Sequence, residues 1–132
     1  MKTRAYKESD YDMIKQWWLE AGCPAPHPSQ LETTGVIGLV DDQPVCAVWI
    51  YRCIDVPIAW LEHFVTNPLG GAAMRKMKAV IAMMDKVMSI LKEDGYQMIR
   101  ATTWSSTLGK VCKKRWGFQI IDGESTNMSL II

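Results

Sequence analysis

The sequence predicts one α+β domain, an α/β sandwich in which a mixed, mostly antiparallel sheet of six to seven strands is flanked by helices. Its 132 residues, 48% of them hydrophobic and 22% charged, suffice for one apolar core. Runs with the two-residue period of strands and runs with the 3.6-residue period of helices follow one another along the whole chain. Their order is strand, helix, three strands, helix, strand, helix and two strands.

The first strand and helix are predicted near the N-terminus. Residues 2–6 alternate between polar and apolar types, as a strand requires. Ser9 is a suitable N-cap for the helix that follows, and Gly22 is a suitable end. The apolar stripe of this helix consists of Ile14, Trp17, Trp18 and Ala21. The proline-rich segment CPAPHPSQ then predicts an extended surface loop.

Three strands and a long helix are predicted in the middle of the chain. Gly35–Val40 and Val45–Tyr51 form a hairpin around the turn Asp41–Pro44, and residues 57–66 add a third strand. A long amphipathic helix begins at Ala73 and ends before Gly95. Its apolar stripe contains Met74, Met77, Ile81, Met84, Met88 and Leu91.

The last part of the chain predicts a strand, a helix and two strands. The strand is YQMIRATTW, and the helix SSTLGKVCKKRWGF has Ser105 or Ser106 as its cap and Gly117 at its end. The final strands are expected near Gln119–Ile121 and Thr126–Ile132. The apolar ending NMSLII has two interpretations, a strand inside the sheet or the edge of a homodimer.

The charge and the cysteines exclude several classes of function. A net charge of +1 gives no general attraction to nucleic acid or to an anionic membrane. No apolar segment is long enough to span a membrane and the first residues lack a secretion signal, so we expect a cytoplasmic protein. The four cysteines have no metal-ligand or redox spacing, so we expect free thiols and no metal site.

The segment VTNPLGGAAMRK leads from the third strand of the middle group into the long helix. The first amide N–H groups of a helix have no partner inside the helix, so such a turn can bind an anion. Gly70 and Gly71 let the backbone approach a phosphate closely, and Ala72 and Ala73 add only a methyl group each. Glycines also occur in such turns for conformational reasons alone, so the pattern by itself leaves both interpretations open.

The order of elements, with LEHFVTNP before the long helix and RWGF after the last helix, resembles the GNAT superfamily of N-acetyltransferases. The segments DYDMIKQWW and AWLEHFVTNP and the compact length look similar to small GNAT-like proteins encoded by tailed bacteriophages. The resemblance implies a GNAT fold, with residues 1–132 as a single acyl-CoA-binding domain. It also implies acetyl-CoA as cosubstrate and an amine-bearing acceptor, a small molecule or a protein.

In that family, the strand before the long helix binds the pantetheine arm and an Arg/Gln-x-x-Gly-x-Gly/Ala turn binds the pyrophosphate. This sequence departs from the pattern, because Pro68 stands three residues before Gly71 and the loop is shorter. Arg75 and Lys76 could approach the phosphate from the helix instead. The resemblance therefore assigns cofactor binding to Phe64, Val65, Thr66, Gly70, Gly71, Ala72, Ala73, Met74, Arg75, Lys76 and Ser106.

Acetyl transfer to an amine needs a base for the amine and an acid for the leaving thiolate. Glu62 and His63 are the candidate bases, and regular alternation points them to opposite faces of their strand. The apolar neighbours Trp60 and Phe64 favour Glu62, since such surroundings make a carboxylate a stronger base. A surface ion pair for Glu62 and a hydrogen-bonding role for His63 are equally open. In the family a tyrosine five residues before the phenylalanine of the GF pair usually acts as the general acid, and Lys113 stands at that position here.

These departures support a second hypothesis. The chain could be a GNAT-fold binding protein that no longer binds the cofactor, for example a phage-encoded modulator of a host protein in the host cytoplasm. The missing Arg/Gln, the shortened loop and Lys113 favour this alternative. Loss of acetyl-CoA binding would distinguish it from the enzyme.

Overall fold

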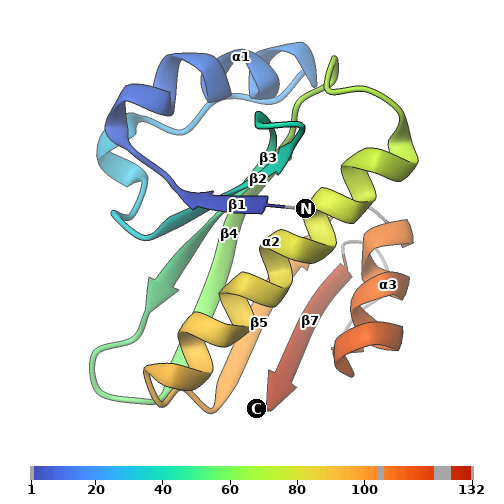
Figure 1. Cartoon of the computed structure of the whole chain (residues 1–132). Coiled ribbons are helices and arrows are strands. Elements are labelled where there is room, and N and C mark those ends of the chain that lie inside the picture. Colours follow the sequence, from blue (N-terminus) through green and yellow to red (C-terminus); the bar gives the residue numbers. More distant parts are fainter. Residues whose placement is uncertain (1, 104–105, 121–125, 132) are drawn as a thin grey trace. The chain divides into compact units, whose positions relative to one another are not determined.

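The computed structural model describes residues 2–103, 106–120 and 126–131 (Figure 1). In chain order the elements are β1 (Lys2–Ala5), the 3-10 helix η1 (Glu8–Asp10), α1 (Tyr11–Glu20), the 3-10 helix η2 (Pro28–Gln30), β2 (Gly35–Val40), β3 (Gln43–Arg52), β4 (Ile58–Thr66), α2 (Ala73–Glu93), β5 (Met98–Thr103), α3 (Ser106–Trp116), β6 (Gln119–Ile120) and β7 (Thr126–Ile131). The predicted order of strands and α-helices is confirmed, and the two 3-10 helices are additional.

The strands differ strongly in length. Only β2, β3, β4, β5 and β7 have six residues or more. Strand β1 has four residues and β6 has two. The expected six to seven strands therefore come down to five full strands of mixed direction, since β1 and β6 contribute only four and two paired residues.

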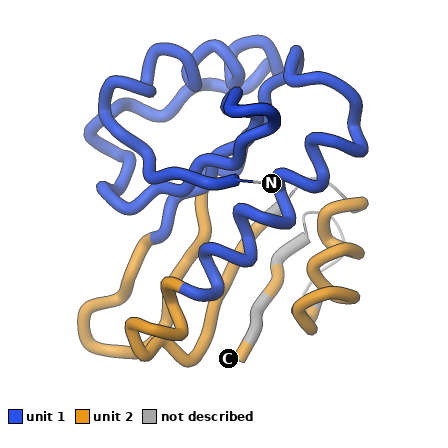
Figure 2. The backbone as a smooth tube through the Cα atoms, viewed as in Figure 1, with its two compact units in different colours: residues 1–50, 63–89 blue, residues 51–62, 90–132 orange. Residues whose placement is uncertain are grey.

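The chain divides into two compact units (Figure 2), each built from two separate segments. Unit 1 contains residues 1–50 and 63–89, and unit 2 contains residues 51–62 and 90–132. The boundary falls inside strands β3 and β4, so neither unit is a continuous piece of chain.

In unit 1 the strands follow the order β1, β2, β3 and the end of β4. The pairs β1·β2 and β2·β3 are antiparallel. Every residue of β2 is buried, which requires a covering layer on both faces of this strand. Helices α1 and α2 supply these two layers.

The two glycines of β2 show which helix covers which face. A Cβ atom at Gly35 would meet Trp49, whose ring lies 5.6 Å from that of Trp18 in α1. A Cβ at Gly38, three residues further and on the opposite face, would lie 2.8 Å from the carbonyl oxygen of Ala79 in α2. The backbone of α2 thus rests directly on β2 at Gly38.

The hairpin turn between β2 and β3 consists of Asp41 and Asp42 alone. Their φ angles are 49° and 64°, as the two central residues of a type I′ turn require. Strand β3 therefore begins at Gln43, two residues before the predicted start. A register shift after Gly38 brings Pro44 opposite Leu39 and lets the strand absorb the proline.

Unit 2 contains the start of β4 followed by β5, β7 and β6. Strands β4 and β5 are parallel, whereas β5·β7 and β6·β7 are antiparallel. Strand β7 lies between β5 and β6, so the apolar ending of the chain is internal to the sheet over its central residues. Helix α3 covers these strands with Leu108 and Cys112, which are buried.

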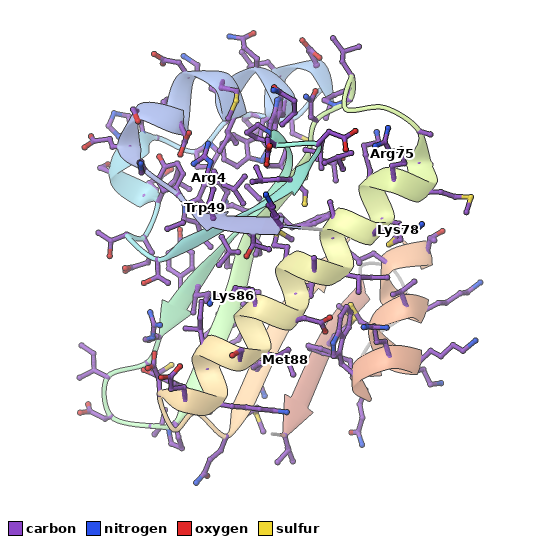
Figure 3. All side chains as sticks on the ribbon, in the orientation of Figure 1. Arg4, Trp49, Arg75, Lys78, Lys86 and Met88 are labelled. Atoms are coloured by element: carbon purple, nitrogen blue, oxygen red, sulfur yellow. The ribbon has the colours of Figure 1, made fainter. Side chains whose placement is uncertain are left out.

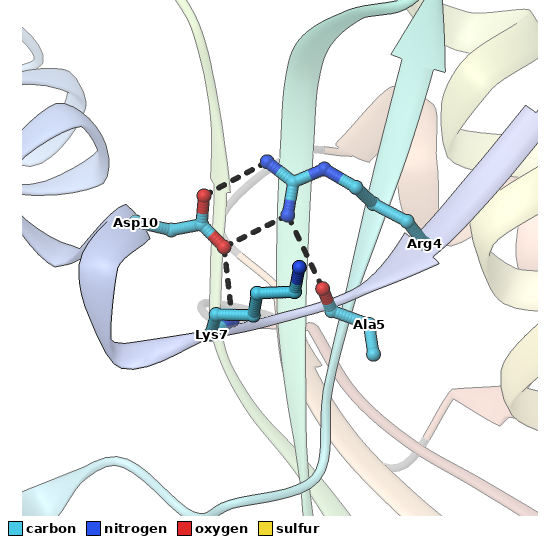
Figure 4. A network of polar contacts seen from close by, with 4 residues as sticks. All are labelled: Arg4, Ala5, Lys7 and Asp10. Atoms are coloured by element: carbon cyan, nitrogen blue, oxygen red, sulfur yellow. Dashed lines mark hydrogen bonds and ion pairs between the residues drawn. The ribbon is translucent and has the colours of Figure 1, made fainter.

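An ion pair fixes the entry into α1 (Figure 4). Arg4 donates two hydrogen bonds of 2.8 Å to the two carboxylate oxygens of Asp10, which also accepts the backbone N–H of Lys7 at 2.9 Å. The predicted cap Ser9 lies inside η1 instead, because Asp10 satisfies the first free amide of this turn.

Replacing Asp10 with asparagine is expected to reduce the free energy of unfolding by about 1–2 kcal/mol, since the bidentate charged pair with Arg4 is lost while the amide oxygen can still accept the Lys7 N–H. The hydrogen bond from Arg4 lowers the pKa of Asp10 below its ordinary value of 3.8. The stabilisation that the Asp10 carboxylate gives to the folded protein is therefore complete above pH 3.8 and is lost as the pH falls through the lowered pKa. Urea unfolding between pH 2 and 7 measures both effects. Asp42→Asn, which removes an exposed 3.7 Å pair with Lys2, is the control and should change little.

The four cysteines are free and differ in their exposure. Burial raises the pKa of the Cys46 thiol to about 12 and that of Cys112 to about 11. At pH 8 a thiol reagent should therefore modify the exposed Cys23 first and the half-buried Cys53 more slowly. Cys46 and Cys112 should react only after denaturant is added. The absorbance of the reagent measures the rate of modification. Rapid modification of all four cysteines in the folded protein would contradict this burial.

Candidate functional site

The turn between β4 and α2, in unit 1, leaves a row of backbone donors open. Asn67 satisfies the start of the turn: its side-chain and backbone oxygens each accept a bond of 3.0 Å, from the amides of Leu69 and Gly70. The carbonyl oxygen of Ala72 accepts the amides of Arg75 and Lys76 at 3.1 Å. Within the described part of the chain, four amides between these groups have no protein acceptor. They belong to Gly71, Ala72, Ala73 and Met74.

This row has the character of an anion-binding nest. All four residues are exposed. The amides begin a helix of 21 residues, whose N-terminus carries a partial positive charge. Four adjacent N–H groups at such a position can bind a phosphate group without any side chain. We call the amides of residues 71–74 the amide nest.

The two glycines of the turn have different physical roles. Gly71 has a φ angle of 99°, and a Cβ atom there would have open space around it. Gly70 is packed against the protein, since a Cβ atom there would lie 3.1 Å from Val45 and from the carbonyl oxygen of Asn67. Of the two, only Gly71 leaves room for a ligand.

Both cations at the start of α2 are engaged within unit 1. Figure 3 shows Arg75 at the N-terminal end of α2, and its guanidinium group donates a hydrogen bond to the carboxylate of Asp41. The Lys76 ammonium group lies 3.4 Å from the carbonyl oxygen of Asn67. Both side chains were expected to bind the phosphate from the helix. In the protein without ligand, each is instead bonded to another group of unit 1.

Strand β4 changes conformation at His63, which has a φ angle of 60°. A left-handed residue inside a strand is uncommon and locally breaks the alternation of faces. The parallel pairing of β4 with β5 ends two residues before His63, at the pair Leu61 and Ala101. Strand β4 itself continues to Thr66. The imidazole ring of His63 packs edge-on against the ring of Trp18, with 6.4 Å between the two ring centres. The regular alternation assumed for Glu62 and His63 therefore does not hold at this point.

The remaining predicted site residues lie in other surroundings. Phe64 and Thr66 are half-buried in β4 and Val65 is buried. Glu62 is half-buried, but Trp60 on its face is 37% exposed and carries the Arg100 guanidinium 5.2 Å from its ring centre. The surroundings expected to favour Glu62 are therefore less apolar than predicted.

Glu62, Lys113 and Ser106 belong to unit 2, whereas His63, the end of β4 and the amide nest belong to unit 1. Lys113 is exposed on α3. Ser106 is the first residue of α3, and its side chain lies outside the described residues. The structure thus brings together only the predicted residues from 63 to 76.

Comparison with solved structures gives matches over nearly the whole chain. The PaiA N-acetyltransferase of Thermoplasma acidophilum, solved with coenzyme A, matches with a TM-score of 0.66 and 14% identity over 99% of this chain and 98% of that one. Ard1 of Thermoplasma volcanium matches with a TM-score of 0.75 and 14% identity over 99% of this chain and 97% of that one. The aminoglycoside 6′-N-acetyltransferase of Enterococcus faecium matches with a TM-score of 0.67 and 13% identity over 99% of this chain and 97% of that one. This chain has the GNAT fold.

The GNAT fold was predicted from the order of elements, and the structural matches confirm it. No family model and no curated protein sequence matches this chain. In the described ranges, no helix is both long and apolar enough to cross a membrane. The same residues contain no group of three or more histidine, cysteine, aspartate or glutamate side chains arranged to hold a metal ion.

The sequence did not predict the contacts of Asn67 and Asp41 near this turn, nor the backbone conformation of the candidate base His63. Asn67 closes the turn, Asp41 holds Arg75, and His63 takes a left-handed conformation. A signal existed for Asn67, because asparagine commonly bonds to the backbone two residues later. The pairing of Asp41 with Arg75 joins residues 34 positions apart and has no local signal.

Proposed function

We propose that this chain is an acetyl-CoA-dependent N-acyltransferase that moves an acetyl group to an amine of a small molecule or protein. The single observation that carries the proposal is the amide nest, four open N–H groups at the start of a long helix. It is supported by the GNAT fold, which this chain shares with N-acetyltransferases, and several of the matching structures were solved with coenzyme A.

The turn fits a diphosphate. The nest offers four donors and a positive helix end, and Gly71 leaves open space where a side chain would stand. Next to it, the backbone of Phe64, Val65 and Thr66 would bind the pantetheine arm along β4. When bound, acetyl-CoA supplies an acetyl group activated as a thioester.

The chain's own residues would then handle the protons. A base accepts a proton from the acceptor amine, the C–N bond forms as the C–S bond breaks, and an acid protonates the leaving thiolate. Glu62 is the proposed base, with His63 as the alternative. Lys113 is the proposed acid. The left-handed conformation of His63 supports a functional role for this part of β4, since such backbone strain collects at functional sites.

The direct test is calorimetric titration with coenzyme A and with acetyl-CoA. We expect saturable binding of both, and binding at least about tenfold weaker for phosphate-free pantetheine, which cannot use the nest. Mass spectrometry of small molecules that co-purify with the protein gives a second readout. Absence of binding and of any thermal shift at millimolar acetyl-CoA would refute the proposal.

That negative result would favour the alternative, a GNAT-fold binding protein without cofactor, such as a phage-encoded modulator of a host protein. One observation supports this alternative: Arg75 and Lys76 are already bound to Asp41 and to the carbonyl of Asn67.

A further inference from the structure

An ion pair joins the β2–β3 turn to the first turn of α2, all within unit 1. The Arg75 guanidinium donates to the carboxylate of Asp41, and the two side chains are 54% and 76% exposed. Arg75 directly follows Met74, the last residue of the amide nest. The cation nearest in sequence to the proposed diphosphate site is therefore held by a carboxylate of the protein itself.

The turn contains a second carboxylate that serves as an internal reference. Asp41 and Asp42 both have left-handed backbones, and their side chains are equally exposed, at 76%. Asp42 instead lies 3.7 Å from Lys2 of β1. The two aspartates thus have the same charge, turn and exposure, and differ in their cationic partner.

We propose that Asp41 determines which anions this site accepts, by competing with the bound phosphate for Arg75. The proposal rests on the proposed function of the amide nest as a diphosphate site. A guanidinium group binds a carboxylate or a phosphate with the same planar pair of donors, so it can serve only one of them fully. The ligand must therefore displace Asp41 before it gains Arg75.

This competition favours ligands with several charges. A diphosphate presents more negative charge than one carboxylate and can replace Asp41 at Arg75, while the nest binds its other oxygens. A ligand with a single carboxylate offers Arg75 nothing that Asp41 does not already provide.

The experiment measures the dissociation constant of coenzyme A for the wild type, Asp41→Asn, Asp42→Asn and the double variant Asp41→Asn/Arg75→Gln. Asparagine tolerates left-handed backbone well, so both single variants retain the turn. We expect Asp41→Asn to bind coenzyme A about three- to fivefold more tightly, as the loss of one exposed competing charge allows. Asp42→Asn should match the wild type, and Arg75→Gln should remove the gain. Circular dichroism and the thermal midpoint check folding.

A selectivity measurement completes the test. Asp41→Asn should leave the affinity for phosphate-free pantetheine unchanged, because that ligand never requires Arg75. Equal gains in Asp41→Asn and Asp42→Asn would show a general charge effect and overturn the proposal. So would unchanged or weaker binding in Asp41→Asn while the wild type binds coenzyme A. If neither the wild type nor Asp41→Asn binds coenzyme A, the proposed function fails as well.

Discussion

Gly38→Ala is expected to lower the free energy of unfolding by about 2–3 kcal/mol, because overpacking a dense interface forces backbone to move. The added Cβ would lie 2.5 Å from the Cys46 sulfur and 2.8 Å from the carbonyl oxygen of Ala79. The sulfur belongs to a side chain, but the carbonyl belongs to the backbone of α2. The helix itself must therefore move away from β2. Urea unfolding at neutral pH measures the loss.

Two further variants separate the causes of this effect. Gly22→Ala also adds a methyl group, but at an exposed position with a φ angle of 76° and open space, so only its backbone strain of about 1 kcal/mol is expected. Cys46→Ala combined with Gly38→Ala removes the contact with sulfur and leaves the contact with the Ala79 carbonyl. We expect partial recovery at most, after allowing for the cavity that Cys46→Ala itself creates. A Gly38→Ala protein as stable as the wild type would show that α2 does not pack this closely on β2.

Gly71→Leu is expected to weaken coenzyme A binding at least about tenfold, since it obstructs several charged hydrogen bonds at once. Gly71 combines a φ angle of 99° with open space. A leucine there would fill that space in front of the amide nest and would strain the turn. Calorimetric titration with coenzyme A measures the change.

Gly22→Leu is the matched control for this substitution. Gly22 has a similar φ angle, 76°, and similar open space, but it follows α1 and has no amide nest beside it. Both variants should lose a similar amount of stability, about 1–2 kcal/mol. Only Gly71→Leu should lose affinity. Equal affinity in the two variants would place the diphosphate elsewhere.

The elements most accurately predicted from sequence are those with a strong local pattern. The methionine-rich stripe placed the start of α2 at Ala73, where the structure also has it, but Met74, the first residue of the predicted stripe, is 77% exposed and does not belong to the core. The run Gly35–Val40 and the segment 57–66 placed β2 and β4 within one residue of their bounds. Such patterns are reliable because each is set by the burial of the element's own side chains, on one face of α2 and on both faces of β2.

Features that depend on distant or exceptional contacts escaped prediction. Ser9 looked like the helix cap, but the carboxylate of Asp10, paired with Arg4 of β1, closes the 3-10 turn that precedes α1. The left-handed conformation of His63 has no signature, since the local sequence suits a regular strand. The turn before α2 was recognised from its glycines, but only the structure separates the packed Gly70 from the open Gly71.

The interleaving of the two units constrains how the newly made chain can fold. Unit 1 is complete only after Ser89 has been synthesised, and by then residues 51–62 have emerged without the segment that completes their own unit. During synthesis these twelve residues, which include the apolar run IAWL, lack the strand β5 that pairs with the start of β4, so backbone groups on that side of β4 remain without a protein partner. We therefore expect this stretch to be the part of the nascent chain most exposed to proteases and to non-native strand pairing.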